Sequence, residues 1–301
     1  MDEKRLQIYT QAGKIAVEAL HHAEKLIRSS RKSSYYILCE KVEKLIKKRG
    51  GEPAFPCNVG VNEVTAHFSP FEEREGSIPS KGLVKVDVGV RIGGSIVDTA
   101  STVPLSSEFK DIVEANKAAL EAAISSMSAG VKTGRIGAVV EAAAKARNYR
   151  TIRNLSGHQI SEYSLHGKKS IPNIGRSLTP KIRAGEIYAV EPFFTFSDAY
   201  GEVVDTNMLR IYQLTKLKRP ADRKQIRLYK QILKRFNRLP FSPRWLTDLM
   251  PLKEVLEILE AMRRRGIVSA FPVLVERSGR PVTQFEHTVL VREEGPLILT
   301  K

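Results

Sequence analysis

The chain has 301 residues, 42% of them hydrophobic, so it can bury a substantial core as one large domain or as one domain that carries a smaller one. Two cysteines are too few for a disulfide-stapled secreted scaffold, and Cys39 and Cys57 lie too far apart for a zinc-binding Cys-x-x-Cys, so we expect two ordinary buried thiols. The formal net charge of +16 favours polyanionic partners such as nucleic acid.

The first 48 residues predict two amphipathic helices that end at Gly50-Gly51. They lack the basic start and apolar core of a signal peptide, and no apolar run approaches the roughly 20 residues of a membrane span. We therefore expect a cytoplasmic protein without membrane contact. Alternating valines then predict a strand over residues 83–90 and another over 95–103, and Ala-rich segments predict helices over 108–128 and 135–148.

The second half of the chain predicts strands around residues 187–196, 203–211, 267–275 and 283–291. Between residues 210 and 266 the pattern becomes helical and basic, with prolines as punctuation, which indicates an inserted helical subdomain. Residues 216–265 contain fifteen lysines or arginines and five acids, a net charge of +10. Because helices and strands mix without strict βαβ alternation, the pattern favours an α+β fold.

The segment between the strands at 83–90 and 95–103 predicts a hairpin that carries two aspartates. A chain reversal centred between Ile92 and Gly93 would place Asp87 and Asp98 directly opposite each other, with Cβ atoms roughly 5 Å apart. Two ionised carboxylates that close repel each other unless one is protonated or a cation lies between them. The hairpin alone leaves a second interpretation open, in which Asp98 caps the end of a strand and Asp87 is merely solvated.

Glu191 and Glu286 each interrupt an otherwise apolar predicted strand, where glutamate is rare unless it is paired or bound to metal. With His158 and the two aspartates they make an oxygen-rich set that suits a pair of divalent ions. The chain contains no His-Glu-x-x-His, Gly-x-Ser-x-Gly, Walker or Gly-x-Gly-x-x-Gly motif. A thiol nucleophile at Cys57, activated by His67, is a weaker alternative.

Five segments together resemble the successive motifs of type II methionine aminopeptidase, most closely its short archaeal form. They are AFPCNVGVNEVTAHFSP (54–70), VDVGVRIGGSIVDTA (86–100), NLSGH (154–158), GEIYAVEP (185–192) and QFEHT (284–288). The resemblance covers essentially the whole chain in the right order. It implies the pita-bread fold, in which two related α+β halves enclose a dinuclear metal site, and it implies removal of the initiator methionine from nascent proteins when the next residue is small.

The resemblance also implies a role for each ligand. Asp87 would hold one ion, Asp98 and Glu286 would bridge both, and His158 and Glu191 would complete the other. The nucleophile would be a hydroxide that bridges the metals, and Glu191 would pass its proton to the leaving amine. The ligand set accepts two ions of Co, Mn, Fe or Zn.

The resemblance places two further histidines at the substrate. His67 would lie near the scissile amide, and His166 would contact the substrate or the developing tetrahedral intermediate. Phe55 and Leu165 would form part of a narrow apolar pocket for the methionine side chain. For the remaining histidines, His21, His22 and His287, we expect ordinary core positions, and strand alternation would turn His287 away from the ligand that precedes it.

The basic segment resembles the helical insertion that separates type II enzymes from type I, with a winged-helix-like outline. The domain prediction is therefore a catalytic domain of residues 1–210 and 267–301 and an inserted basic subdomain of residues 211–266. Its charge favours contact with ribosomal RNA where nascent chains emerge, but a solvated helix face of a heat-adapted protein is equally compatible with it. We expect a monomer.

Two other functions share parts of this pattern. A proline dipeptidase of the same fold would use the same five ligands, although the TAHFSP stretch at 65–70, the insertion and the lack of a large N-terminal domain favour the aminopeptidase. A non-catalytic relative that binds RNA or protein partners would be expected to have lost ligands, whereas all five are present here.

Overall fold

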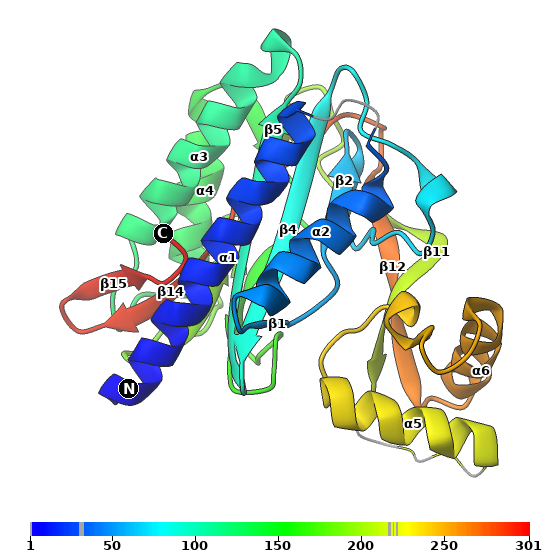
Figure 1. The fold of residues 1–301 in the computed structure, drawn as a ribbon. Coiled ribbons are helices and arrows are strands. Elements are labelled where there is room, and N and C mark those ends of the chain that lie inside the picture. Colours follow the sequence, from blue (N-terminus) through cyan, green and yellow to red (C-terminus); the bar gives the residue numbers. More distant parts are fainter. Residues whose placement is uncertain (1, 30–32, 216–217, 219, 221) are drawn as a thin grey trace.

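A computed structural model of the chain describes residues 2–29, 33–215, 218, 220 and 222–301. Lys216 and Arg219 of the predicted basic segment lie outside the described residues. The first half of the fold contains two helices and a long hairpin, as predicted (Figure 1). Its elements are α1 (Glu3–Ser29), α2 (Tyr35–Lys48), β1 (Glu52–Pro53), β2 (Asn58–Val61), β3 (Val64–Ala66), the 3₁₀ turn η1 (Glu73–Glu75), β4 (Leu83–Ile92) and β5 (Ser95–Pro104).

Helix α1 packs along the β4–β5 hairpin because it presents small side chains to the sheet (Figure 1). Its buried face includes Ala12, Ala16, Ala19 and Ala23, which recur at helical spacing and let the helix backbone approach the strands closely. Helix α2 begins at the N-cap Ser34, whose hydroxyl accepts from the Ile37 amide at 3.1 Å. The hydrophobic positions that the sequence predicted on both helices thus pack into one core with residues of β4.

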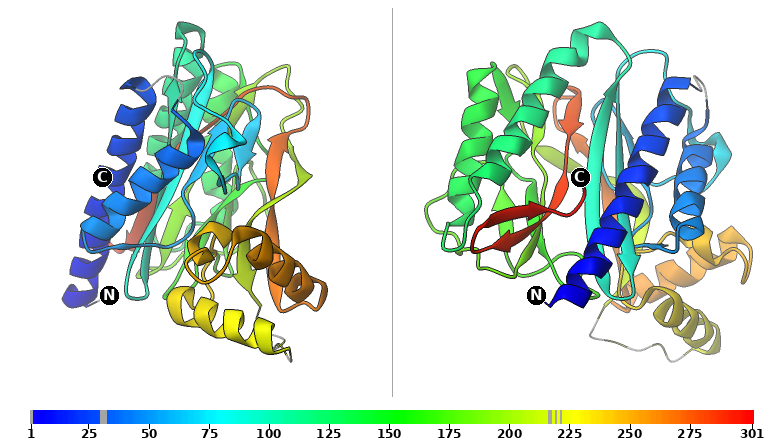
Figure 2. Two further views of the ribbon diagram at one scale, coloured as in Figure 1. Left: turned by 45° about the vertical axis from the view of Figure 1, so that its right-hand side comes forward. Right: turned by 60° about the vertical axis from the view of Figure 1, so that its left-hand side comes forward.

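The second half adds another helix pair and the remaining strands. These elements are η2 (Ser107–Phe109), α3 (Lys110–Ser125), α4 (Thr133–Ala146), β6 (Tyr149–Thr151), β7 (Ser156–Ile160), β8 (Ser170–Pro172), β9 (Ile187–Val190), β10 (Phe193–Phe196), β11 (Val203–Leu214), α5 (Arg223–Phe236), η3 (Pro243–Leu246), α6 (Leu252–Arg264), β12 (Val268–Glu276), β13 (Val282–Gln284), β14 (His287–Arg292) and β15 (Gly295–Ile298). Helices α3 and α4 pack with β9 and β14 in a second core, on the side of the molecule away from α2 (Figure 2).

Four antiparallel sheets carry these strands. Their orders are β1-β4-β2 with β5 beside β4, β13-β10-β6, β11-β12-β3, and β15-β14-β9-β7-β8. Two of the predicted strands are broken in the structure, 187–196 at Glu191-Pro192 and 283–291 at Phe285-Glu286. Pro192 has no amide hydrogen to give to a ladder, so β9 ends before it and β10 begins in a different sheet.

The predicted register of the β4–β5 hairpin is wrong by two residues. Asp87 pairs with Ala100 and Asp98 pairs with Gly89, because the turn is formed by Gly93 and Gly94 and not by Ile92 and Gly93. Gly93 adopts a φ of 59°, which a two-residue hairpin turn requires and glycine tolerates. Asp87 and Asp98 are therefore diagonal neighbours on one face of the sheet, farther apart than the directly opposed pair that the sequence predicted.

Strands β11 and β12 form a long ribbon whose far end carries α5, η3 and α6 (Figure 1). These helices share a hydrophobic cluster of their own, which includes Leu228, Ile232, Leu246, Leu259 and Met262. The pairing of β11 with β12 continues through Leu214 and Val268, so the predicted boundaries at 211 and 266 fall within or beside the ribbon. Among the described residues, no helix is long and apolar enough to cross a membrane.

Candidate metal centre and substrate cavity

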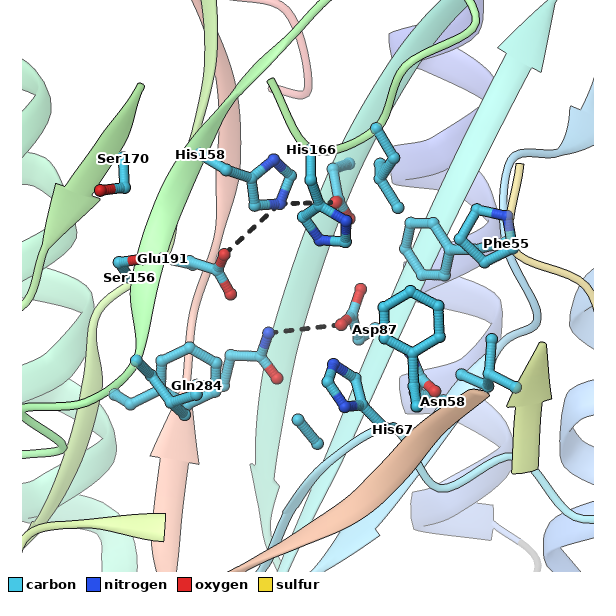
Figure 3. A pocket seen from close by; sticks show the side chains of 18 of the residues that line it. Phe55, Asn58, His67, Asp87, Ser156, His158, His166, Ser170, Glu191 and Gln284 are labelled. Carbon is cyan, nitrogen blue, oxygen red and sulfur yellow. Dashed lines mark hydrogen bonds and ion pairs between the residues drawn. The ribbon is translucent and has the colours of Figure 1, made fainter. Parts of the chain in front are cut away.

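Five side chains converge where the two helix-bearing halves meet, and we call them the acidic cage: Asp87, Asp98, His158, Glu191 and Glu286. Asp87 and Asp98 come from β4 and β5, and His158 from the middle of β7. Glu191 and Glu286 stand at the two strand breaks, β9 to β10 and β13 to β14. Figure 3 shows His158, Glu191 and Asp87 around one central space. The sequence-predicted set is thus brought together.

The cage is compact enough to share a cation. His158 Nε2 lies 3.7 Å from Asp98 Oδ2 and 3.5 Å from Glu191 Oε1. One ligand atom from each of Asp98, His158 and Glu286 lies within 4.8 Å of the others. Gln284 Nε2 faces both Asp87 Oδ2 at 3.4 Å and Glu286 Oε2 at 3.5 Å, which links Asp87 to the same group.

Burial raises the pKa of every carboxyl in the cage. The pKa of Asp87 rises to about 6, chiefly through burial. The pKa values of Asp98 and Glu286 rise well above the usual range, through burial and then through the neighbouring carboxylates. Burial and the charges of Asp98 and Asp87 do the same for Glu191. Four carboxylates this close cannot all be ionised without a compensating positive charge.

The donor atoms of the cage fit divalent cations. Asp87 Oδ1, Asp98 Oδ1 and Glu286 Oε1 are buried and accept no hydrogen bond from the part of the chain that the structure describes. Burial also lowers the pKa of His158 well below 6.5, which keeps the imidazole neutral and its nitrogen lone pair free. Unpaired carboxylate oxygens with a neutral imidazole are ligands that divalent first-row ions accept.

Hydrogen bonds between β5 and the β13–β14 segment hold the two halves of the cage in register. The Thr288 hydroxyl accepts from the Asp98 amide at 2.6 Å and donates to its carbonyl at 2.7 Å. The Glu286 amide donates to Ala100, and the Thr99 hydroxyl donates to the Glu286 carbonyl. Because these hydrogen bonds join buried threonine hydroxyls and backbone groups on both sides, the positions of Asp98 and Glu286 are tightly fixed.

A cavity of about 360 Å³ opens beside the cage, and Figure 3 looks into it. Phe55, His67, Leu165 and His166, all expected at the substrate, line it. Several further lining residues were missed by the sequence interpretation: Asn58, Ala66, Ile211, Pro240, Phe271 and Gln284. Within the predicted strand 283–291, the alternation of Gln284 with Glu286 was a usable signal for Gln284, because residues two apart share a face of a strand.

His67 and His166 face the cage from different loops. His67 follows β3 with a φ of 65°, an unusual conformation for a non-glycine residue that is common at functional sites. Its Nδ1 lies 3.1 Å from the Pro272 carbonyl, which can only accept, so Nδ1 carries the hydrogen and Nε2 is an acceptor. Burial lowers the pKa of His67 and keeps it neutral.

The His166 ring lies 4.4 Å from the His158 ring, centroid to centroid. The His166 side chain is exposed to the cavity, yet the protein atoms around it lower its pKa, and the neighbouring His67 adds to this effect. The imidazole rings of His67 and His166 are therefore neutral hydrogen-bonding groups near pH 7.

The remaining histidines and the cysteines behave differently. His287 faces Thr300, with 3.0 Å between Nδ1 and Oγ1, as expected for a residue turned away from the cage. His21 is exposed on α1, so the expectation of a core position was wrong for it. Cys39 and Cys57 are buried free thiols, as predicted. The hydrogen bond with Cys39 and burial raise the pKa of the Cys57 thiol, which disfavours the thiolate that a nucleophile would need.

Comparison with known proteins points to one family. The model of metallopeptidase family M24 matches residues 7–293. A methionine aminopeptidase of Saccharolobus solfataricus is 38% identical over 100% of this chain and 99% of its own length. Further archaeal relatives at similar identity carry the same name, which does not favour the proline dipeptidase or non-catalytic alternatives.

Solved structures confirm the predicted α+β pita-bread fold. A thermophilic Arx1 has a TM-score of 0.87 at 17% identity, over 99% of this chain and 91% of that one. A methionine aminopeptidase of Thermotoga maritima has a TM-score of 0.71 at 22% identity, over 100% and 98%. The chain therefore belongs to metallopeptidase family M24, as an archaeal-like type II methionine aminopeptidase, a metal-dependent hydrolase that removes N-terminal methionine.

Proposed function

We propose that the acidic cage is the site of two divalent ions, for which Asp87, Asp98, His158, Glu191 and Glu286 would supply the protein ligands. This proposal rests on the convergence of five donor side chains from five segments, three of them buried and two half-buried, and three of them with an unpaired buried oxygen. When bound, the ions supply Lewis-acid chemistry that activates water and polarises a carbonyl. Co, Mn, Fe and Zn all suit the donor set, and metal analysis of protein purified without added metal tests which ions it retains.

Glu191 is the general base and acid of the proposed reaction. Its Oε1 lies inside the cage, 3.5 Å from His158 Nε2, so it can take a proton from a water that enters there and return it to the leaving amine. Nε2 of His67 accepts a hydrogen bond from the N–H of the scissile amide. The neutral His166 ring beside His158 donates to the developing oxyanion.

The cavity selects the N-terminal residue by shape. Phe55 and Leu165 form the predicted apolar wall, and Ile211 and Phe271 extend it. A methylene in such a pocket is worth about 1–3 kcal/mol, so these contacts favour methionine over shorter or branched side chains. We infer that the residue after the methionine must be small, because His67 and Phe271 pack together, 5.4 Å between ring centroids, on the same wall of the cavity.

Replacement of Glu191 by glutamine tests the assignment. We expect kcat on a Met-Gly peptide to fall by about 100- to 10,000-fold at saturating metal, with metal occupancy verified by calorimetry. Wild-type protein should cleave Met-Gly peptides with added metal, lose this activity on chelation, and leave Xaa-Pro peptides intact. Full activity of Glu191→Gln, or preferential cleavage of Xaa-Pro peptides, would contradict the proposal.

We also propose that residues 211–266 form a distinct basic insertion that contacts RNA. Four exposed cations, Arg223, Arg227, Lys230 and Lys234, recur on α5 at intervals of four, three and four residues, which places them in one stripe about 16 Å long. None forms an ion pair with the residues that the structure describes, and α5 contains no acid. An unpaired cationic stripe suits a phosphate backbone.

The cytoplasmic location, the winged-helix outline and the monomeric state stay predictions.

A further inference from the structure

Arg244 is a buried charge that joins the helical insertion to the N-terminal half of the molecule. It lies in η3, and its Nη1 donates to Glu43 Oε2 of α2 at 2.9 Å, while its Nη2 donates to Glu43 Oε1. The neighbouring Trp245 donates its Nε1 hydrogen to Glu43 Oε2 at 2.7 Å. Arg244 is 6% exposed and Glu43 is 4% exposed, so water screens this ion pair very little.

Glu43 also holds the loop that leads into β2. Its Oε1 accepts from the Cys57 amide at 3.0 Å, and Cys39 Sγ donates to the Cys57 carbonyl at 3.3 Å. Pro56 has no amide hydrogen, so Cys57 supplies the anchoring contacts of this turn. A buried loop requires such partners for its polar backbone. One carboxylate thus binds the insertion on one side and the 54–57 loop on the other.

The 54–57 loop forms a wall of the substrate cavity. Phe55 lies in it, and Asn58 follows it as the Cα partner of Asp87. The Phe55 ring fills the space above Gly89, where an added Cβ would lie only 2.2 Å from Cε1. A shift of the loop would therefore move both a cavity wall and the residue that pairs with Asp87. Pro240, which precedes η3, lines the same cavity directly.

We propose that Arg244 is a positioning residue: acting through Glu43 and Cys57, it fixes the Phe55 wall and makes the insertion part of the methionine-selecting site. The inference rests on the proposed function only in assigning the cavity to methionine. Removing one member of a buried ion pair leaves an uncompensated charge, whereas replacing both is often neutral for stability. The pair is therefore expected to contribute to the geometry of the pocket more than to the stability of the fold.

The double variant Arg244→Met/Glu43→Gln isolates this contribution. Glutamine keeps an oxygen acceptor for the Cys57 amide, and both charges of the buried pair disappear together. Glu40, which also accepts from Arg244 Nη1, is half-buried and keeps Lys44 Nζ at 3.7 Å. The matched control is Arg263→Met/Glu260→Gln, which removes another bidentate pair of the insertion, at 2.7 and 3.0 Å, both of whose members lie in α6. The probes are L-methionine and L-leucine, titrated by calorimetry against Mn²⁺-loaded protein, with KM and kcat measured on a Met-Gly peptide.

In the Arg244→Met/Glu43→Gln protein we expect the affinity for L-methionine to fall about 10-fold, within the range of coupling between contacting residues. The ratio of the affinity for L-methionine to that for L-leucine should fall. KM for the Met-Gly peptide should rise, and kcat should change less than about twofold because the cage is untouched. Mn²⁺ affinity should be unchanged. The control pair should leave all these quantities as in the wild type.

The wild-type protein offers a second readout, because Trp245 is the single tryptophan of the chain and contacts Glu43. L-methionine should shift its emission, and the double variant should lose this shift while still binding the ligand.

Binding of L-methionine without any emission change in the wild type would overturn the proposal. So would unchanged ligand affinity in a folded double variant, or equal losses in the control. If calorimetry detects no L-methionine binding to the wild type at all, the proposed function itself fails, and the inference fails with it.

Discussion

Gly89 has no Cβ, and this leaves room for the Phe55 ring in the wall of the substrate cavity. It lies in β4 between Asp87 and Arg91, and a methyl group there would meet the Phe55 ring at 2.2 Å from Cε1 and 2.5 Å from Cδ1. Its backbone is an ordinary strand conformation, so alanine brings no φ strain. In Gly89→Ala we expect a folded protein in which Phe55 is displaced, and KM for a Met-Gly peptide should rise about 10-fold.

The comparison for Gly89→Ala is Gly175→Ala, away from the cavity, in which the added methyl meets Ala138 Cβ at 3.2 Å and Glu141 Oε2 at 3.6 Å, both ordinary or slightly tight contacts. Steady-state kinetics and thermal unfolding of both variants separate a pocket effect from a packing effect. Unchanged KM in Gly89→Ala, or an equal rise in both variants, would show that Phe55 does not limit the pocket.

At the same scale, residue chemistry predicted the cage but not the cavity. Glu191 and Glu286 stood out because a carboxylate in an apolar segment needs a partner, and the structure brings them to His158. Phe271 and Pro240 gave no such signal. An aromatic ring or a proline in an apolar run packs in a core as readily as it lines a cavity, and only the folded chain distinguishes the two.

At the scale of elements, the predicted helices and strands were largely correct, and the errors lie at their ends. Residues 187–196 look like one strand in sequence, yet the chain changes sheets at Glu191-Pro192. That break is what frees Glu191 from a ladder position. The hairpin register was wrong because two adjacent glycines, Gly93 and Gly94, allow the turn to form at either of two positions.

The cationic stripe on helix α5 is expected to bind RNA. A variant with glutamine at all four positions of the stripe should bind a polyuridine oligonucleotide more weakly, because each phosphate contact releases counterions. The four positions are Arg223, Arg227, Lys230 and Lys234. The slope of log affinity against log salt should flatten by about 3 if all four cations contact phosphates. Filter binding at several salt concentrations measures this slope.

The matched control for α5 changes the same number of exposed cations on α1: Lys4, Lys14, Lys25 and Arg28. Both variants lose four positive charges, so any effect of net charge alone appears equally in each. If the two variants bind the oligonucleotide alike, the stripe on α5 is an ordinary solvated face and the RNA proposal is wrong. Co-sedimentation with ribosomes then extends the measurement to the expected partner.

At the scale of the whole molecule, repulsion among the carboxylates of the acidic cage lowers the free energy of unfolding until a bound cation neutralises it. Two of its members belong to the half built on α1 and α2, and three to the half built on α3 and α4, so repulsion within the cage acts across the junction of the two cores. The hydrogen bonds of Thr288 to Asp98 resist this repulsion. Bound metal should therefore stabilise the molecule as a unit, in the way that any ligand of the native state does.

The raised pKa values of the cage carboxyls make the free energy of unfolding of the metal-stripped protein depend on pH. In metal-stripped protein the pKa of Asp87 is raised from 3.8 to about 6 in the folded chain. Between these pH values the folded chain binds more protons than the unfolded chain, so this group's contribution to the free energy of unfolding falls as pH rises. Asp98, Glu191 and Glu286 shift in the same direction and extend the fall to higher pH.

The gap in Tm between Mn²⁺-loaded and chelated protein should therefore widen as pH rises from about 4 through 6, because metal binds the ionised carboxylates and removes their repulsion. Taking the difference between the two forms cancels surface carboxylates such as Glu260, whose arginine partners lower its pKa to about 2 in either form. Scanning calorimetry at matched ionic strength measures both Tm values. A gap that stays constant or narrows over this range would mean that the cage carboxylates are not the groups that the metal neutralises.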